Sequence, residues 1–246
     1  ASQKNIVRVL AEHPRPIWSE AIYEFVKDPR EGLNQEALQA LTQVGHPKLI
    51  DVLRDALNAG DPALRNKAYT ILAERTDHES EQLAMDYALK QLADENLDAA
   101  TFSVTLNLLN RVKDKRAAPL LLQQFSRQNN KQALIRTLAV TGDEETAAFL
   151  VDKFVGLQSH EQPEVLKALR ALNSPQFQEL AARSLLSDNG SLSQSAALEL
   201  YQDGSPESIE ILIDALKKAG NSTTLGSVCS VLAQLATPQA REALRG

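Results

Sequence analysis

The sequence is poor in the residues that build disulfides, metal sites and aromatic surfaces. It contains one cysteine, Cys229, which excludes an intrachain disulfide and a thiolate-rich zinc site. Aromatic residues make up only 4% of the chain, and the net charge is −6, so neither base stacking nor a global positive field favours nucleic acid. No run of about eighteen apolar residues occurs. We therefore expect no nucleic-acid partner and no membrane insertion.

Catalytic and cofactor motifs are also missing. The four histidines, at positions 13, 46, 78 and 160, do not pair at metal-binding spacing. No Gly-x-Ser-x-Gly elbow surrounds a serine, and no glycine-rich phosphate loop occurs. We expect structural or solvent roles for the histidines and a buried core position for Cys229. The sequence thus predicts no catalytic residue, no metal, no cofactor and no enzymatic activity.

What the chain does contain is an internal repeat. Equivalent leucines recur at gaps of 31, 31, 37, 29, 31, 31 and 32 residues, at positions 10, 41, 72, 109, 138, 169, 200 and 232. Self-similarity at this period is typical of solenoids, in which each unit buries its apolar face only against its neighbours. We call these leucines the anchors.

Three apolar columns accompany the anchors. An apolar residue stands three before every anchor, which makes one helical stripe. Apolar residues also stand twelve and sixteen after the anchors, on one face of the helix that follows the anchor helix and begins the next pair. We call the helix that carries the anchor the second helix of its pair. The +12 column consists of Ile22, Leu53, Ala84, Leu121, Leu150, Ala181, Leu212 and Leu244. Exposure of these leucines to water would contradict the phasing of the repeat.

The residues between the two helices of a repeat agree with this phasing. Four residues after the anchor, Gly or Asn is frequent, and either can end a helix in the left-handed conformation. The next column supplies six hydrogen-bond acceptors suited to capping: Asp77, Asp114, Asp143, Ser174, Ser205 and Thr237. One position further stand prolines 16, 47, 175, 206 and 238, which we expect at the first position of a helix.

The pattern predicts an all-α fold of antiparallel helix pairs, about seven repeats in one α-solenoid. We expect a lone helix at 3–12, then pairs at 16–27 with 33–44, 47–58 with 62–75, 78–93 with 98–112, and 115–127 with 131–141. Further pairs begin near residues 144, 175 and 206, and a half-unit begins at 238. The 37-residue gap predicts a longer first helix and a loop at 94–96. We expect 1–246 to form a single elongated domain and to be part of a longer chain.

The sequence resembles the short HEAT-like repeats, the variety also found in phycobilin lyases. The resemblance is carried by the Leu-x-x-x-Gly-[Asp/Ser/His]-Pro ending, as in residues 41–47, and by segments 61–72 and 113–121. It implies a right-handed superhelix whose second helices line a concave groove. It also implies a non-enzymatic scaffold for a protein or extended peptide. Alternatives are an accessory domain of a larger enzyme such as a zinc aminopeptidase, bound to the rest of its own chain, or a phycobilin-lyase-like chaperone.

The outward positions of the second helices lie two and six before each anchor. These sixteen positions hold four bases and no acid, which suits an acidic or polar extended peptide. The candidate partner-binding residues are Asn66, Ser103, Asn107, Gln132, Arg136 and Lys167.

Charge also segregates along the chain, with acids dominating residues 77–98 and bases dominating 111–136. The basic stretch could dock an acidic partner, or the two stretches could be neutralising solvated faces.

Overall fold

The computed structural model describes residues 3–13, 15–26, 33–218, 222–235 and 238–245. Every regular element within these ranges is helical, and they contain no strand, which confirms the all-α class. None of these helices is both long and apolar enough to cross a membrane. The chain divides into two compact units, residues 1–108 and 109–246, which are described separately.

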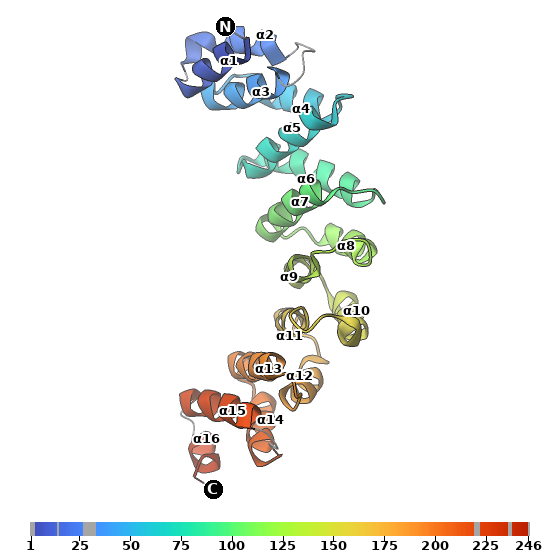
Figure 1. Cartoon of the computed structure of the whole chain (residues 1–246), viewed down its shortest axis with the longest axis vertical. Coiled ribbons are helices and arrows are strands. Elements are labelled where there is room, and N and C mark those ends of the chain that lie inside the picture. Colours follow the sequence, from blue (N-terminus) through green and yellow to red (C-terminus); the bar gives the residue numbers. More distant parts are fainter. Residues whose placement is uncertain (1–2, 14, 27–32, 219–221, 236–237, 246) are drawn as a thin grey trace. The chain divides into compact units, whose positions relative to one another are not determined.

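The first unit consists of paired helices in two layers (Figure 1). Its elements are α1 (Gln3–Glu12), η1 (Pro16–Trp18), α2 (Ser19–Val26), α3 (Leu33–Val44), α4 (Leu49–Leu57), α5 (Pro62–Glu74), α6 (His78–Leu92) and most of α7 (Ala99–Val112). Helices α1, α3 and α5 contact one another in order, and α4 contacts α6 in the other layer. The 15-residue α6 and the loop after it accommodate the long repeat, as predicted.

The second unit repeats the two-layer arrangement. Its elements are η2 (Lys115–Ala117), α8 (Ala118–Gln124), α9 (Lys131–Thr141), α10 (Glu144–Lys153), η3 (Phe154–Gly156), α11 (Gln162–Ala171), α12 (Phe177–Leu185), α13 (Gly190–Asp203), α14 (Pro206–Lys218), α15 (Ser222–Leu235) and α16 (Pro238–Ala243). The second helices α9, α11, α13 and α15 contact in sequence. The first helices form the other layer, in which α8 contacts α10 and α14 contacts both α12 and α16.

The core is made of the predicted columns. Four leucines of the +12 column are fully buried, namely Leu53, Leu121, Leu150 and Leu212. Seven of the eight anchors are fully buried too, which confirms the phasing. Leu10, Val26 and Leu216 are half-buried rather than buried. Two further positions differ from the prediction. Cys229 is only half-buried, and Leu244, which follows the end of α16, remains 39% exposed.

Capping side chains begin the first helices, as predicted. Asp77 accepts a hydrogen bond from Ser80 N, Asp114 from Arg116 N and Asp143 from Thr146 N. Ser174 and Ser205 also accept from backbone N–H groups two and three residues on, whereas Thr237 lies outside the described residues. These bonds satisfy N–H groups that have no partner within the helix.

His46 occupies the same capping column and has a structural role. Its Nδ1 accepts from Lys48 N at 3.1 Å, and its ring stacks on Tyr23 with the centroids 5.1 Å apart. The Nε2 atom lies 3.4 Å from a carboxylate oxygen of Glu20. The imidazole is buried, so it caps a helix and fills space between two repeats at once.

Two details of the helix boundaries correct the sequence prediction. Gly45, Asn173 and Gly204 take the left-handed conformation, but Gly142 has an extended backbone with φ −82°. At Gly142 a Cβ would lie 2.6 Å from Leu138 O, so glycine is needed there for close approach. Pro47 and the proline at 175 lie in turns two residues before α4 and α12, rather than at the first helical position.

Leu150→Ala should lower the free energy of unfolding by about 2–5 kcal/mol, because it opens a cavity between helix layers. Urea denaturation followed by circular dichroism measures this change. Val155→Ala, at a position 80% exposed, is the control and should change stability by less than about 0.5 kcal/mol. Equal effects of the two substitutions would contradict the assignment of the core.

Candidate partner-binding surface

The six candidate residues lie on second helices, and none of their side chains is buried. In the first unit, Asn66 is on α5 and both Ser103 and Asn107 are on α7, all exposed. Asn66 Oδ1 accepts a hydrogen bond from Thr101 Oγ1 at 3.4 Å, which links α5 to α7. Ser103 and Asn107 lie on the exposed face of α7, and neither belongs to a polar cluster like the one in the second unit. Their role as binding residues stays a prediction.

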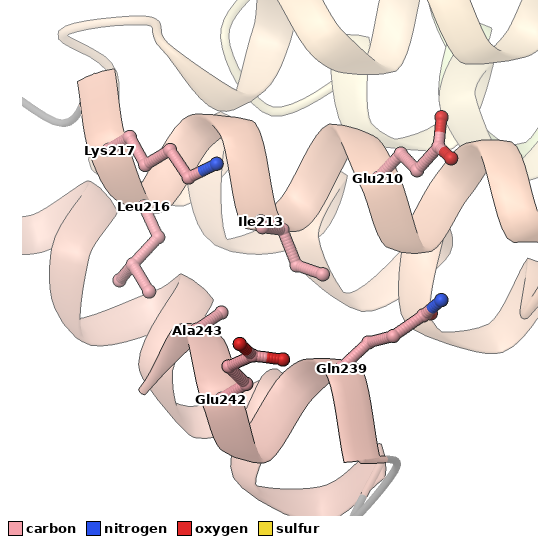
Figure 2. Close-up of a pocket in the computed structure, with 7 residues that line it drawn as sticks. All are labelled: Glu210, Ile213, Leu216, Lys217, Gln239, Glu242 and Ala243. Atoms are coloured by element: carbon pink, nitrogen blue, oxygen red, sulfur yellow. The ribbon is translucent and has the colours of Figure 1, made fainter. Parts of the chain in front are cut away.

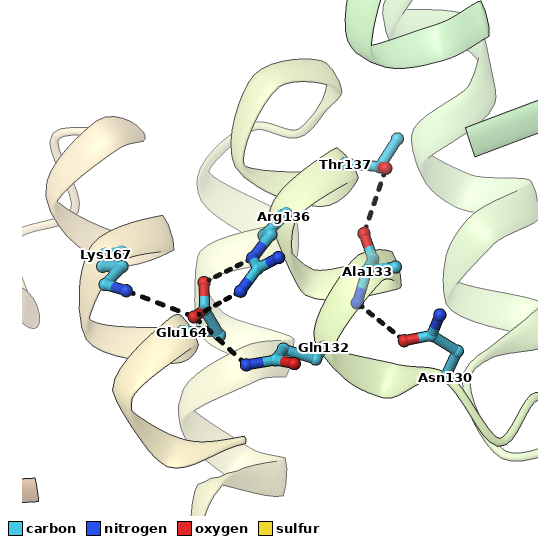
Figure 3. A network of polar contacts seen from close by, with 7 residues as sticks. All are labelled: Asn130, Gln132, Ala133, Arg136, Thr137, Glu164 and Lys167. Carbon is cyan, nitrogen blue, oxygen red and sulfur yellow. Dashed lines mark hydrogen bonds and ion pairs between the residues drawn. The ribbon is translucent and has the colours of Figure 1, made fainter. Parts of the chain in front are cut away.

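The three candidates of the second unit converge on one carboxylate, that of Glu164 on α11 (Figure 3). Arg136 donates from Nε to Oε2 and from a terminal nitrogen to Oε1, each at 2.9 Å. Lys167 Nζ lies 3.2 Å from Oε1, and Gln132 Nε2 lies 3.4 Å from it. A bidentate arginine fixes the orientation of the carboxylate as well as its charge. The cluster therefore joins α9 to α11 with defined geometry.

Local structure places each member of this cluster. Asn130 caps α9 by accepting from Ala133 N at 3.1 Å, which sets Gln132 and Arg136 one turn apart on the same face. Glu164 lies in the first turn of α11, where the helix dipole favours a negative charge. Lys167 follows Glu164 by three residues, so it reaches the same oxygen along its own helix.

Burial and ion pairing act together on the charges. The Glu164 side chain is only 6% exposed, whereas Arg136 and Lys167 keep 56% and 46% of their side-chain surface in solvent. The hydrogen bonds from Arg136, helped by Lys167, lower the pKa of Glu164 to about 2 in spite of burial. The same contact raises the pKa of Arg136. Glu164 therefore stays ionised across the physiological pH range.

Glu164 is the residue that the sequence interpretation missed. Only positions two and six before each anchor were counted as outward, and none of these is acidic. Glu164 lies five residues before its anchor, Leu169. Its carboxylate lies at the contact between α9 and α11, where it accepts a hydrogen bond from Arg136 of the predicted surface. The positive charge predicted for this surface is thus partly neutralised. Its only sequence signal is the spacing of Glu164 and Lys167 on one helix.

Polar links continue along the second-helix layer of this unit. Arg170 on α11 donates from Nε to Glu199 Oε2 on α13 at 2.7 Å, and from a terminal nitrogen to Gln202 Oε1, also at 2.7 Å. The Glu199 side chain is 2% exposed. Ser193 on α13 and Thr224 on α15 share a buried hydrogen bond of 3.2 Å. In this unit, the steps from α9 to α11, from α11 to α13 and from α13 to α15 are therefore each bridged by a polar contact.

The charged stretches are largely paired locally. In the acidic stretch, Asp77 lies 2.9 Å from Arg75, and Glu79 accepts from Arg54 at 3.0 Å. In the basic stretch, Arg116 pairs with Asp114 at 2.7 Å. These contacts favour solvated faces with mixed charge as the main role of both stretches. Within the described residues, no group of three or more His, Cys, Asp or Glu side chains could hold a metal ion.

A cavity of about 780 Å³ lies between α14 and α16 (Figure 2). Ile213 and Leu216 project into it from α14, and Ala243 borders it on α16. Glu210 and Glu242 contribute carboxylates at its edge. None of the six candidate residues lines this cavity, so the sequence prediction did not include it.

The fold and this surface together define a helical repeat protein built from helix pairs in two layers. Residues 19–105 match the model for HEAT repeats, which confirms the resemblance inferred from the sequence. No curated protein matches the chain significantly.

Solved structures that are similar to the chain include the following two. The complex of CpcE and CpcF of phycocyanin lyase from Nostoc sp. PCC7120 contains a chain with 20% identity and a TM-score of 0.45, with 92% of each chain covered. An engineered protein has 16% identity and a TM-score of 0.38, with coverage of 99% of this chain and 98% of that one.

Glu164→Gln should make stability less dependent on pH below about 5. Because the folded-state pKa of Glu164 is depressed to about 2, its contribution is fully present above the unfolded value near 4.5 and is lost as pH falls toward 2. Solvent screening of the half-exposed Arg136 and Lys167 weakens the ion pairs. We therefore expect the free energy of unfolding of the wild type to exceed that of the variant by about 1–2 kcal/mol at pH 7. Urea denaturation at pH 7, 5 and 3 measures the difference.

The exposed Glu179 on α12 provides the control, Glu179→Gln. A difference between wild type and Glu164→Gln that stays constant from pH 7 to pH 3 would contradict the proposed ion pairing.

Proposed function

We propose that the chain is a non-enzymatic scaffold that binds an extended segment of a protein partner along its second helices. The observation that carries the proposal is the Glu164 cluster. One buried carboxylate holds Arg136, Lys167 and Gln132 in place while the two cations remain half-exposed. Donors that are already ordered lose little conformational entropy when they bind a carboxylate or a backbone carbonyl of a partner.

The charges of the cluster favour an acidic or polar partner. Arg136 and Lys167 against Glu164 leave a net charge of +1, and the carboxylate faces inward. The guanidinium of Arg136 offers further N–H groups beyond the two that bind Glu164. A partner carboxylate would therefore meet positive charge first. Such complementarity steers association and selects partners more than it raises affinity.

Two other functions remain predictions from the sequence, namely an accessory domain of a larger enzyme and a phycobilin-lyase-like chaperone. Neither is favoured by a particular contact within the described residues. Peptide binding can be tested first, because it depends on side chains that can be replaced, namely those of the Glu164 cluster.

The test must remove the surface charge without leaving a buried charge unpaired. Reversing the charge at Arg136 alone would place a second carboxylate next to that of Glu164. Repulsion between the two carboxylates would destabilise the contact between α9 and α11. The triple variant Arg136→Gln, Glu164→Gln, Lys167→Gln instead neutralises the whole cluster and retains groups that form hydrogen bonds. We expect a partner captured from native extract by wild type to bind this variant at least about tenfold more weakly by calorimetry.

The matched control replaces Lys90 and Lys217, exposed lysines on first helices, by glutamine. This control changes charge away from the second-helix layer and should leave the dissociation constant unchanged. Equal affinity of wild type and the triple variant, with both folded by circular dichroism, would refute the assignment of this surface.

A further inference from the structure

A groove of about 490 Å³ opens between α8 and α10, in the first-helix layer of the second unit. Its apolar lining comes from Leu122 and Phe125 on one side and from Phe149 and Leu157 on the other. Ser126, Lys131, Lys153 and Gly156 complete the lining, and we call the site the lysine groove after its two cations. Its volume lies within the range of about 300–1,000 Å³ that ligand sites commonly have.

The floor of the lysine groove is a pair of aromatic rings. Phe125 and Phe149 meet edge to face, with centroids 5.2 Å apart and an interplanar angle of 81°. Phe125 belongs to the buried column that follows the anchors by sixteen, so its ring is held by the core. Phe149 on α10 is half-buried and faces the groove. The floor is therefore rigid and suited to an apolar side chain.

Each ring carries a cation above it. Lys131 Nζ lies 5.6 Å from the centroid of Phe125, and Lys153 Nζ lies 5.3 Å from that of Phe149. Lys131 Nζ also donates to Gln128 O at 3.1 Å, and Lys153 Nζ pairs with Asp152 at 2.7 Å. The latter pair is exposed, and exposed pairs contribute little, so an incoming carboxylate can replace Asp152.

The lining of the lysine groove contains no acidic residue, unlike three other cavities of the described chain. The cavity between α2 and α4 measures about 190 Å³ and includes Asp55. A polar cavity of about 220 Å³ at the start of α12 includes Asp203. The cavity between α14 and α16 includes Glu210 and Glu242. The lysine groove differs from these three cavities because its lining carries two positive charges and no carboxylate. The chain as a whole has a net charge of −6.

Helix geometry explains why the groove is open. Helix α8 has only 7 residues, and α10 gives way to the short 3-10 helix Phe154–Gly156. The groove lies where both helices end, because Phe125 and Ser126 follow α8, and Gly156 and Leu157 follow α10. Beside the groove, Val155 is 80% exposed, which adds apolar surface next to the rim residue Gly156. The groove therefore offers an apolar side chain a place on the two rings, with a cation close to each ring.

We propose that the lysine groove docks an acidic segment of a protein partner, in which a carboxylate stands next to an aromatic or aliphatic side chain. The apolar side chain packs on Phe125 and Phe149, and the carboxylate lies between Lys131 and Lys153. Lys131 is the first residue of the second helix α9, and the rest of the lining belongs to α8, α10 and the segments that follow them. The site shares no residue with the Glu164 cluster. A test can therefore contradict the binding site proposed here without contradicting the function proposed above, and the reverse also holds.

The experiment selects peptides from a random phage-displayed library on the intact wild-type chain. Counter-selection uses Lys131→Glu, Lys153→Glu, which reverses both charges at half-exposed or exposed positions. We expect enriched peptides in which Asp or Glu adjoins Phe, Leu or Ile. Their affinity, measured by fluorescence anisotropy, should fall at least about tenfold in the lysine variant.

A second variant, Ser126→Trp, fills the groove from an exposed lining position without changing charge. It should weaken the same peptides, whereas the neutralised Glu164 cluster should bind them as wild type does. Failure to enrich any peptide that distinguishes wild type from both groove variants would overturn the proposal. Binding of octanoate at the groove without peptide enrichment would also overturn it, in favour of a lipid carboxylate.

Discussion

The structure depends on the burial of two apolar stripes in each helix pair against the neighbouring pairs. No single pair can cover both its anchor column and its +12 and +16 columns, so each repeat contributes half of an interface to the next. Leu41, Leu138 and Leu169 are fully buried only because helices from adjacent repeats meet around them. Stability in such an array is a sum of repeat and interface terms. A substitution in one column therefore weakens two interfaces, while distant repeats keep their packing.

Buried carboxylates add orientation to this apolar packing. Burying Glu164 and Glu199 costs desolvation, and the cost is offset only when Arg136 and Arg170 approach from the neighbouring helix in the right geometry. Helices α9, α11 and α13 are thereby restrained along their lengths, whereas apolar stripes alone would tolerate small sliding. The same contacts hold the cationic ends of Arg136 and Lys167 at the surface. One interaction thus serves both the register of the helices and the order of the proposed binding surface.

The sequence predicts the features that depend on local spacing. The anchors, the buried columns and the caps at Asp77, Asp114 and Asp143 follow from helical period and capping chemistry. They are found with a few exceptions, among them Leu10, Cys229 and Leu244, which are not fully buried. Glu164 was missed because its partner Arg136 is 28 residues away and belongs to another repeat. The left-handed conformation expected at Gly142 is not found, and glycine is needed there because a Cβ would lie 2.6 Å from both Leu138 O and Thr146 Cγ2, which the spacing of the repeat does not reveal. The cavities could not be predicted, because their size depends on helix ends such as Phe154–Gly156 that a repeat pattern does not resolve.

The two helix layers of the second unit differ in chemistry for a physical reason. Second helices such as α11 and α13 have 10 and 14 residues and pack closely enough for side chains of one helix to reach carboxylates on the next. Their surface charges are therefore paired and ordered. Between the first helices α8 and α10 the rings of Phe125 and Phe149 line a groove without an acidic lining residue. Lys131, at the start of α9, and Lys153 lie over these rings. A partner segment rich in polar groups suits the first surface, whereas one that combines a carboxylate with an apolar side chain suits the second.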